Sequence, residues 1–233
     1  MLKIQGLECG YGRIKVLEGV NLEVGNESVG LFGPNGAGKT TLIGAVMGMN
    51  KVWSGTIELD GKRIDGTETH LMARAGVALV PQERELFPGM SVEDNLVLGA
   101  AYIPHAKGRT AESLEWVFSL FPILRERRKQ LAGTMSGGQQ RMVAIARALM
   151  SKPRLLILDE PSLGLQPSIV SEVFEVLKEL KKSVSILVTE QNVRESLKAI
   201  DRGYVLENGK ILLEDTPEGL KTNPHVLKSY LGI

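Results

Sequence analysis

The chain has 233 residues, 43% of them hydrophobic, and its 28 basic and 27 acidic side chains give a net charge of +1. This suits one large globular domain or two small ones, and so balanced a charge favours neither a nucleic-acid partner nor general attraction to anionic membranes. The single cysteine, Cys9, excludes an internal disulfide and predicts a reducing compartment. Lys3 and Gln5 argue against a secretory leader, and no apolar run reaches the roughly 18 residues that span a bilayer, so we expect a chain that stays in water.

The first 65 residues alternate short apolar and polar runs, LKIQGL, VNLEV and GTIELDGKRI. Turn signals at residues 10–12 and at Asp60-Gly61 separate them, and this pattern predicts antiparallel strands. Within this region, SVGLFGPNGAGKTTLIGAVMGM predicts a buried strand, a glycine-rich loop and a helix from about Lys39 to Met49.

The rest of the chain predicts a helical stretch between further strands. Residues 77–80 form an apolar run that Pro81 ends, and residues 91 to about 150 are helical in pattern, with Ser91 and Asp94 as a capping box. The runs RLLILDE and SVSILV predict parallel strands buried on both faces, with the helix SIVSEVFEVLKELKK between them. A hairpin on Asn208-Gly209 and a C-terminal helix follow.

The glycine-rich loop GPNGAGKT matches the phosphate-loop pattern G-x-x-x-x-G-K-[ST] in full, between a predicted strand and a predicted helix. Its backbone N–H groups and the helix N-terminus favour phosphate, Lys39 neutralises the β- and γ-phosphates, and the Thr40 hydroxyl can ligate Mg²⁺. The alternative, a glycine-rich turn with an exposed lysine, explains less of this context. The predicted nucleotide-binding residues here are Gly33, Pro34, Asn35, Gly36, Ala37, Gly38, Lys39, Thr40 and Thr41.

Two carboxylates, Asp159 and Glu160, end the apolar run RLLILDE. The carboxyl ends of parallel strands line the ligand crevice of such a sheet. There Asp159 can reach Mg²⁺, directly or through water, and Glu160 can orient or deprotonate an attacking water. Alone, such a strand end would be interpreted as solvent-facing surface; beside a phosphate loop, catalysis is the better interpretation.

A second phosphate site is predicted at MSGGQQ, where a helix to Met150 begins. Ser136 is the expected N-cap, and two consecutive glycines stabilise a helix start poorly. We therefore interpret them as exposing backbone N–H groups to a phosphate at the positive helix end. The residues of this site are Ser136, Gly137, Gly138 and Gln139.

The motifs GPNGAGKT, MSGGQQR and LLILDEPS, with Gln82 after a strand, resemble the ATPase subunits of ATP-binding cassette transporters over essentially the whole chain. The resemblance implies an α/β P-loop NTPase fold with a RecA-like parallel core sheet, an N-terminal antiparallel β subdomain and an inserted α-helical subdomain. Residues 1–233 would be one ATPase domain, with its core at 1–85 and 151–233 and the helical subdomain at 86–150.

The resemblance also implies how the sites are used. Two cassettes meet head to tail, and each ATP lies between the phosphate loop of one and the Ser136–Gln139 segment of the other. Tyr11 stacks on adenine, as a tyrosine at a strand end could; the alternative is a plain surface aromatic. Thr40, Gln82 and Asp159 hold Mg²⁺, and residues 83–88 face the membrane partner.

In this family the strand after the Asp-Glu pair ends in a switch loop, usually with a histidine near the γ-phosphate. Along VTEQNVRESL that position holds Gln191. Its amide can donate a hydrogen bond to phosphate but cannot become cationic near neutral pH. We expect Gln191 to act in catalysis with Glu160 and Lys39; the alternative is a plain surface amide.

The segments VTEQN, DEPSLGLQP, RGYVLENGKILLED and YLGI resemble the shorter ATPase subunit of branched-chain amino-acid importers. Many members carry Glu where this chain has Gln82, and many cassettes carry Asp where Gln166 stands. The resemblance implies an ATPase at the cytoplasmic face of the cell membrane, using ATP and Mg²⁺. Its partners would be permease subunits, a second ATPase subunit in a homodimer or heterodimer and, indirectly, an extracytoplasmic solute-binding protein, with no nucleic acid.

Other functions remain open at this point. NVRESL and the short length also resemble the ATPase of the lipopolysaccharide exporter, although that one usually keeps the histidine. Soluble cassette proteins that act on DNA or ribosomes often carry two cassettes or a long coiled-coil insertion, and the spacing between Lys39 and Ser136 is too short for one. The basic run RERRK at 125–129 fits a solvated helix face. The intact Glu160 disfavours a nucleotide-binding module without catalysis.

Overall fold

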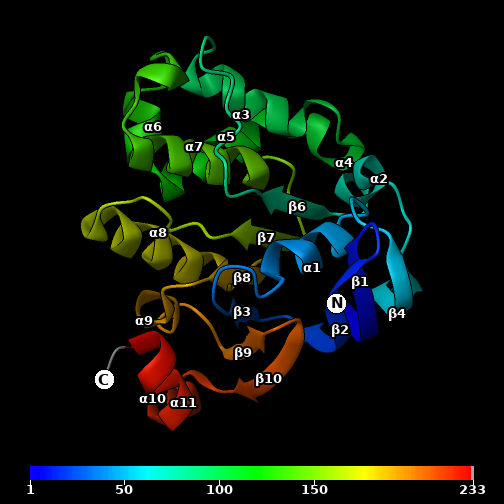
Figure 1. Ribbon diagram of the computed structural model, residues 1–233. Coiled ribbons are helices and arrows are strands. Elements are labelled where there is room, and N and C mark those ends of the chain that lie inside the picture. Colours follow the sequence, from blue (N-terminus) through cyan, green and yellow to red (C-terminus); the bar gives the residue numbers. More distant parts are fainter. Residues whose placement is uncertain (232–233) are drawn as a thin grey trace.

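Two β-sheets and a group of helices make up the computed structural model, which describes residues 1–231 (Figure 1). The smaller sheet is antiparallel, in the order β2-β1-β4-β5. Its strands are β1 (Leu2–Tyr11), β2 (Ile14–Val24), β4 (Val52–Leu59) and β5 (Lys62–Arg63). The N-terminal antiparallel strands were therefore predicted correctly.

Two predicted turns differ in outcome. Asp60 and Gly61 both have positive φ, 51° and 73°, as a type I′ turn requires, so this turn is confirmed. The turn expected at residues 10–12 starts later, because Gly10 and Tyr11 belong to β1. Gly10 is a close-approach position instead, since a Cβ there would lie 1.9 Å from the carbonyl oxygen of Ile14.

The larger sheet has the order β10-β9-β3-β8-β7-β6 and is parallel from β9 to β6, with β10 antiparallel at one edge. Its strands are β3 (Ser28–Phe32), β6 (Val77–Val80), β7 (Leu155–Asp159), β8 (Ser185–Glu190), β9 (Arg202–Glu207) and β10 (Lys210–Asp215). Every residue of β3, β7 and β8 is buried. Strands covered on both faces need no polar side, which explains their solid apolar runs.

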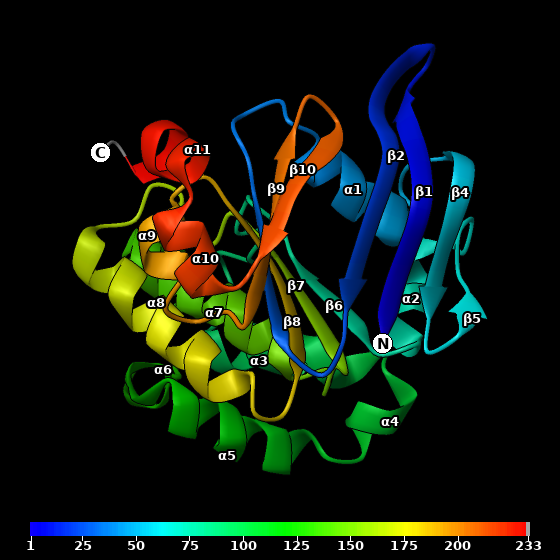
Figure 2. The ribbon, with the colours of Figure 1, turned by 90° about the horizontal axis from the view of Figure 1, so that it is seen from below.

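One face of the larger sheet shares a core with α1 (Lys39–Val46), α2 (Thr69–Arg74) and the antiparallel sheet, so that α1 lies between the two sheets (Figure 2). The other face packs against α8 (Pro167–Leu180), α9 (Val193–Ser196), α10 (Pro217–Thr222) and α11 (Pro224–Val226). A π-helical turn, Leu227–Leu231, follows α11. The strands β3, β7 and β8 therefore present their carboxyl ends between two covered faces.

The remaining helices lie between β6 and β7 in the chain and stand together at the top of Figure 1. They are α3 (Val92–Ala101), α4 (Pro104–Lys107), α5 (Thr110–Leu120), α6 (Pro122–Glu126) and α7 (Gly137–Leu149), with a 3₁₀ turn at Ala132–Thr134. Ser91 caps α3 as predicted, but only half of the capping box forms, because the Asp94 carboxylate accepts from the Ser91 hydroxyl.

The α/β class predicted from the sequence, with a parallel core sheet and an antiparallel N-terminal part, is confirmed by this arrangement. Within residues 1–231, no helix combines the length and apolarity that crossing a membrane requires.

Candidate functional site

The glycine-rich loop joins β3 to α1 at the carboxyl end of the larger sheet. Gly38 is the N-cap of α1 at φ 111°, a conformation that residues with a side chain rarely adopt. Gly33 lies so close to β9 that a Cβ would come within 2.2 Å of the Leu206 carbonyl oxygen. The loop therefore presents bare backbone at the helix N-terminus.

The tip of the β9–β10 hairpin contacts the backbone of this loop. The Gly209 N–H donates to the Ala37 carbonyl oxygen at 3.1 Å, and the Gly209 carbonyl oxygen accepts from the Glu18 N–H at 2.9 Å. Gly209 has φ 76°, and a Cβ there would lie 1.9 Å from the Val16 carbonyl oxygen. The sequence predicted only a turn here, because contacts between backbone groups leave no side-chain pattern.

Lys39 lies buried at the centre of the site. Its Nζ donates to the carbonyl oxygens of Gly33 (2.7 Å) and Pro34 (3.2 Å) and lies 3.0 Å from Glu160 Oε1. The predicted phosphate-neutralising cation and the predicted catalytic carboxylate are thus a direct ion pair.

Asp159 is held on both of its oxygens by hydroxyl groups. Thr40 Oγ1 donates to Oδ2 at 2.9 Å, and Thr189 Oγ1 donates to Oδ1 at 2.6 Å. A hydroxyl and a carboxylate are the oxygen ligands that Mg²⁺ takes together with substrate phosphates. The adjacent Thr40 hydroxyl and Asp159 carboxylate fit a Mg²⁺ that arrives with phosphate. Within residues 1–231, no group of three or more His, Cys, Asp or Glu side chains could hold a metal ion.

A cavity of about 440 Å³ unites most of the predicted nucleotide site. Tyr11, on β1, forms its outer edge and is 53% exposed, while its hydroxyl accepts from Thr41 Oγ1 (3.4 Å) and Asn50 Nδ2 (3.3 Å). The side chain is therefore anchored at its hydroxyl. The lining consists of Tyr11, Val16, Asn35, Gly36, Gly38, Lys39, Thr40, Thr41, Gln82 and Glu160.

The end of β8 positions Glu160, the predicted catalytic carboxylate. The Glu160 N–H is directed at Thr189, with 3.1 Å to its carbonyl oxygen and 3.2 Å to Oγ1. Glu160 has φ 46°, an unfavourable value for a residue with a side chain, which persists only where neighbours impose it. Thr189 imposes it here, although the sequence did not single this residue out.

Glu190, the last residue of β8, is a further functional candidate that the sequence did not indicate. Its side chain is 2% exposed, and its oxygens accept from the Ser162 N–H at 2.9 Å and the Ser162 hydroxyl at 2.8 Å. Burial raises the pKa of Glu190 to about 7; the Ser162 hydrogen bonds oppose the shift, and the charge of Glu160 adds to it. A charged residue two positions after the apolar run at 186–188 was the available signal.

Gln191, by contrast, is exposed and does not line the cavity. Its side chain makes no hydrogen bond to any of the residues that the structure describes. The catalytic role of Gln191 therefore stays a prediction.

The Ser136–Gln139 segment lies outside this cavity, at the start of α7. A full capping box forms, in which Ser136 Oγ accepts from the Gln139 N–H at 3.3 Å and Gln139 Oε1 accepts from the Ser136 N–H at 3.2 Å. Gly138 also serves packing, because a Cβ there would lie 2.6 Å from Ile169 Cγ2; at Gly137 the nearest atom to a Cβ would be Nη2 of the flexible Arg84 side chain, at 2.8 Å, which can move away. Exposure of backbone N–H groups is thus only one reason for glycine here.

Two arginine side chains of helix α7 also bind the backbone of the loop after β6. Arg141 is 2% exposed and donates to the carbonyl oxygens of Pro81 (2.7 Å) and Gln82 (2.5 Å), while burial lowers the pKa of its guanidinium. Arg147 donates to the Glu85 carbonyl oxygen at 2.9 Å. The path of the Gln82 loop is therefore fixed by α7, which the sequence did not predict.

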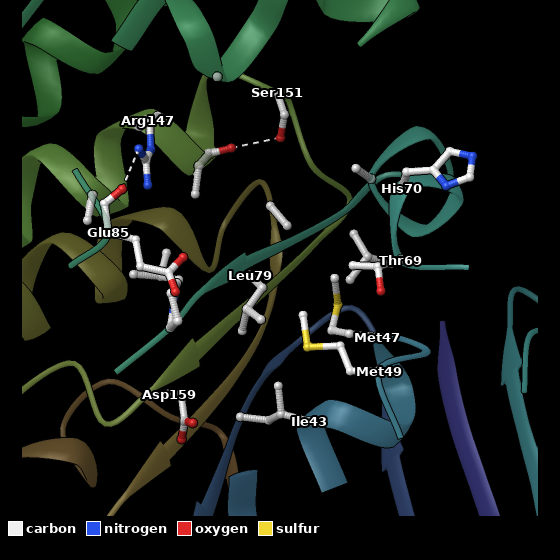
Figure 3. Close-up of a pocket in the computed structure, with 18 of the residues that line it drawn as sticks. Ile43, Met47, Met49, Thr69, His70, Leu79, Glu85, Arg147, Ser151 and Asp159 are labelled. Carbon is white, nitrogen blue, oxygen red and sulfur yellow. Dashed lines mark hydrogen bonds between the residues drawn. The ribbon is translucent and has the colours of Figure 1, made fainter. Parts of the chain in front are cut away.

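A second cavity, of about 620 Å³, opens between the C-terminal end of α1, α2, β6 and the helices α3 and α7 (Figure 3). Thr40 and Asp159 belong to its lining, so it adjoins the pair that fits Mg²⁺. Of the predicted partner-facing residues 83–88, Glu85 and Phe87 line it. Its walls are largely apolar: Ile43, Met47, Met49, Leu79, Phe87, Leu98 and Ile103.

The family described as ABC transporter matches this chain at residues 17–163. The chain is 44% identical to the high-affinity branched-chain amino acid transport ATP-binding protein BraG of Pseudomonas aeruginosa, with 100% of both chains covered. It is 36% identical to the lipopolysaccharide export system ATP-binding protein LptB of Haemophilus influenzae, over 100% of this chain and 97% of that protein. A crystal structure of an ATP-binding cassette of an ABC transporter in its ADP conformation matches with a TM-score of 0.85 at 29% identity, covering 100% of this chain and 99% of that one.

Proposed function

The chain belongs to the ABC transporter family and is an ATPase subunit of a transporter, and we propose that it drives import of branched-chain or other hydrophobic amino acids. The full-length identity of 44% to an amino-acid transport subunit, against 36% to a lipopolysaccharide export subunit, supports the solute class. Export of a lipid-linked polysaccharide is the second candidate, because that match also spans the chain.

One observation carries the chemistry: the 3.0 Å contact between Lys39 and Glu160 inside the cavity lined by the phosphate loop. A γ-phosphate bound at Lys39 lies next to the carboxylate that orients the attacking water. Mg²⁺, which Thr40, Asp159 and Gln82 would hold, neutralises phosphate charge when bound. Tyr11 would contact the base at the outer edge, and Gln191 would reach the γ-phosphate from the loop after β8.

The Ser136–Gln139 segment supports a head-to-tail pair. Ser136 Oγ and the first N–H groups of α7 are phosphate donors that lie outside the chain's own cavity. They would complete the ATP site of a second cassette, either an identical chain or a sister subunit. Residues 86–150 would move as a helical subdomain that carries this segment.

The second cavity supports docking of a permease at the cytoplasmic face of the membrane. Its apolar walls fit the apolar face of a short helix, and Arg147 offers a cation at its polar end, beside Glu85 (Figure 3). Because Thr40 and Asp159 also line this cavity, a helix bound there would lie next to the nucleotide site.

The test is to purify tagged Glu160→Gln with ATP from detergent-solubilised membranes of the native host. Loss of the water-orienting carboxylate should retain ATP and stabilise the assembly. We expect a permease and a second cassette subunit to co-purify, and leucine, isoleucine and valine uptake to fall in cells that express this variant. Lys39→Ala, which weakens ATP retention, is the matched control. Export components in the eluate would favour the second candidate; ribosomes or DNA would contradict transport.

A further inference from the structure

Glu190 is a buried carboxylate beside Glu160 to which the proposed mechanism gives no task. A buried acidic side chain is costly unless hydrogen bonds or charges compensate it. The charged groups that face it are Glu160, from the end of β7, and Arg141, from α7. Neither forms an ion pair with it; its hydrogen bonds go to Ser162 instead.

The Glu190 carboxylate accepts two hydrogen bonds from Ser162, which lies two positions beyond Glu160. Thr189, the neighbour of Glu190, holds the Glu160 N–H itself. The end of β8 thus hydrogen-bonds to both neighbours of the buried Pro161, through Thr189 to Glu160 and through Glu190 to Ser162.

We propose that Glu190 is a positioning residue for ATP hydrolysis, which by holding Ser162 keeps Glu160 aimed at the attacking water. The inference rests on the proposed hydrolytic role of Glu160. Glu160 has φ 46°, an unfavourable backbone conformation that persists only where the surrounding structure fixes it. Thr189 fixes the N-terminal side, while Glu190 fixes the C-terminal side.

The same contact sets the start of the segment 162–166, in which Leu163 is exposed. Beyond it, Ile169 packs against Gly138 in the first turn of α7. The Ser162 contact therefore lies between Glu160 and the Ser136–Gln139 segment, which we propose to bind the ATP of a second cassette. Losing it would loosen both ends of this connection.

The hold on Ser162 depends on the length of the side chain rather than on its charge. The Ser162 hydroxyl rotates, so it can donate to a carboxylate or accept from a side-chain amide. Glutamine at 190 can still accept from the Ser162 N–H and donate to its hydroxyl. Aspartate keeps the charge but is one methylene too short to reach both groups.

These properties define the experiment, which uses the full-length protein in the complex purified from its membranes. MgATP hydrolysis is measured for Glu190→Ala, Glu190→Asp and Glu190→Gln, with kcat and KM obtained separately. We expect Ala and Asp to lower kcat about tenfold with KM changed less than twofold, and Gln to rescue kcat to within about twofold of wild type. Circular dichroism melting checks that each variant is folded.

Ser162→Ala approaches the contact from the other side, because it removes the hydroxyl and keeps the N–H. We expect kcat to fall about threefold, and Ser162→Ala with Glu190→Asp to fall no further than Glu190→Asp alone. An active Asp variant with an inactive Gln variant would show that charge matters, and wild-type kcat in all variants would show that the contact is idle; either result overturns the inference alone. Absence of ATP turnover in the wild-type complex would instead overturn the proposed function, and this inference with it.

Discussion

Replacing Glu190 by Gln should stabilise the protein in a way that depends on pH. The pKa of the Glu190 carboxyl is about 7 in the folded protein and 4.5 in the unfolded chain, chiefly because burial disfavours its charged form. The folded state therefore binds more protons between these values. The stability that neutral Glu190 contributes is complete below pH 4.5 and is lost as the pH rises through 7.

The size of this loss follows from the two pKa values. They differ by about 2.5 pH units, and each unit corresponds to about 1.4 kcal/mol, so ionisation of Glu190 costs the folded state about 3 kcal/mol at pH 8. No discount for solvent screening applies, because the side chain is 2% exposed. Glutamine is neutral at every pH and avoids this cost.

Urea unfolding followed by circular dichroism, at intervals from pH 4.5 to 8, measures the effect. The free energy of unfolding of Glu190→Gln minus that of wild type should grow by about 3 kcal/mol across this range. Glu179→Gln, on the exposed surface of α8, is the control and should change the free energy by less than about 0.5 kcal/mol at each pH. A difference for Glu190→Gln that stays constant with pH would refute the argument that this buried group titrates near neutrality.

Three further substitutions test other contacts of the site. Gly209→Ala places a Cβ 1.9 Å from the Val16 carbonyl oxygen, so the hairpin must shift and its hydrogen bond to the Ala37 carbonyl oxygen is lost. A fluorescent ATP analogue should then bind about tenfold more weakly. Gly61→Ala is the control, at φ 73° with nothing within 4 Å of a Cβ, and should leave binding unchanged. Arg141→Lys replaces two guanidinium nitrogens, each of which donates to its own carbonyl oxygen, by one nitrogen on a shorter side chain, and it should lose about 2 kcal/mol of unfolding free energy in urea. An unchanged value would show that these two hydrogen bonds do not stabilise the loop. Gln191→Ala should lower ATP turnover measured by phosphate release, and unaltered turnover would remove Gln191 from catalysis.

The sequence alone predicted those parts of the site whose residues are neighbours in the chain. The phosphate loop, the Asp159-Glu160 pair and the cap at Ser136 are local patterns, and local geometry needs no knowledge of the fold. The structure brings Lys39, Thr40, Asp159 and Glu160 into direct contact through the parallel order of β3 and β7 around β8. That meeting follows from the rule that ligands bind at the carboxyl ends of parallel strands.

The contacts that escaped prediction join distant segments or use backbone atoms. Gly209 donates to the Ala37 carbonyl and Arg141 to two carbonyls, and a carbonyl group is present at every residue, so no side-chain pattern marks the partner. Glu190 escaped for another reason. In a central strand covered on both faces, alternation does not distinguish buried from exposed positions, so Thr189 and Glu190 could not be told from the exposed Gln191.

The hydrogen bonds from α7 to the loop after β6 bear on how related subunits could recognise different membrane partners. The hydrogen bonds of Arg141 and Arg147 go to main-chain oxygens at positions 81, 82 and 85, so they do not depend on the side chains at those positions; the Arg147 guanidinium also lies 6.0 Å from the centre of the Phe87 ring. Apart from Arg84 and Phe87, whose side chains contact α7, residues in the proposed docking segment 83–88 can then differ between related cassettes while the backbone keeps its path. The residues that select a membrane partner could therefore change during evolution while the backbone of the loop and the residues that bind ATP stay the same.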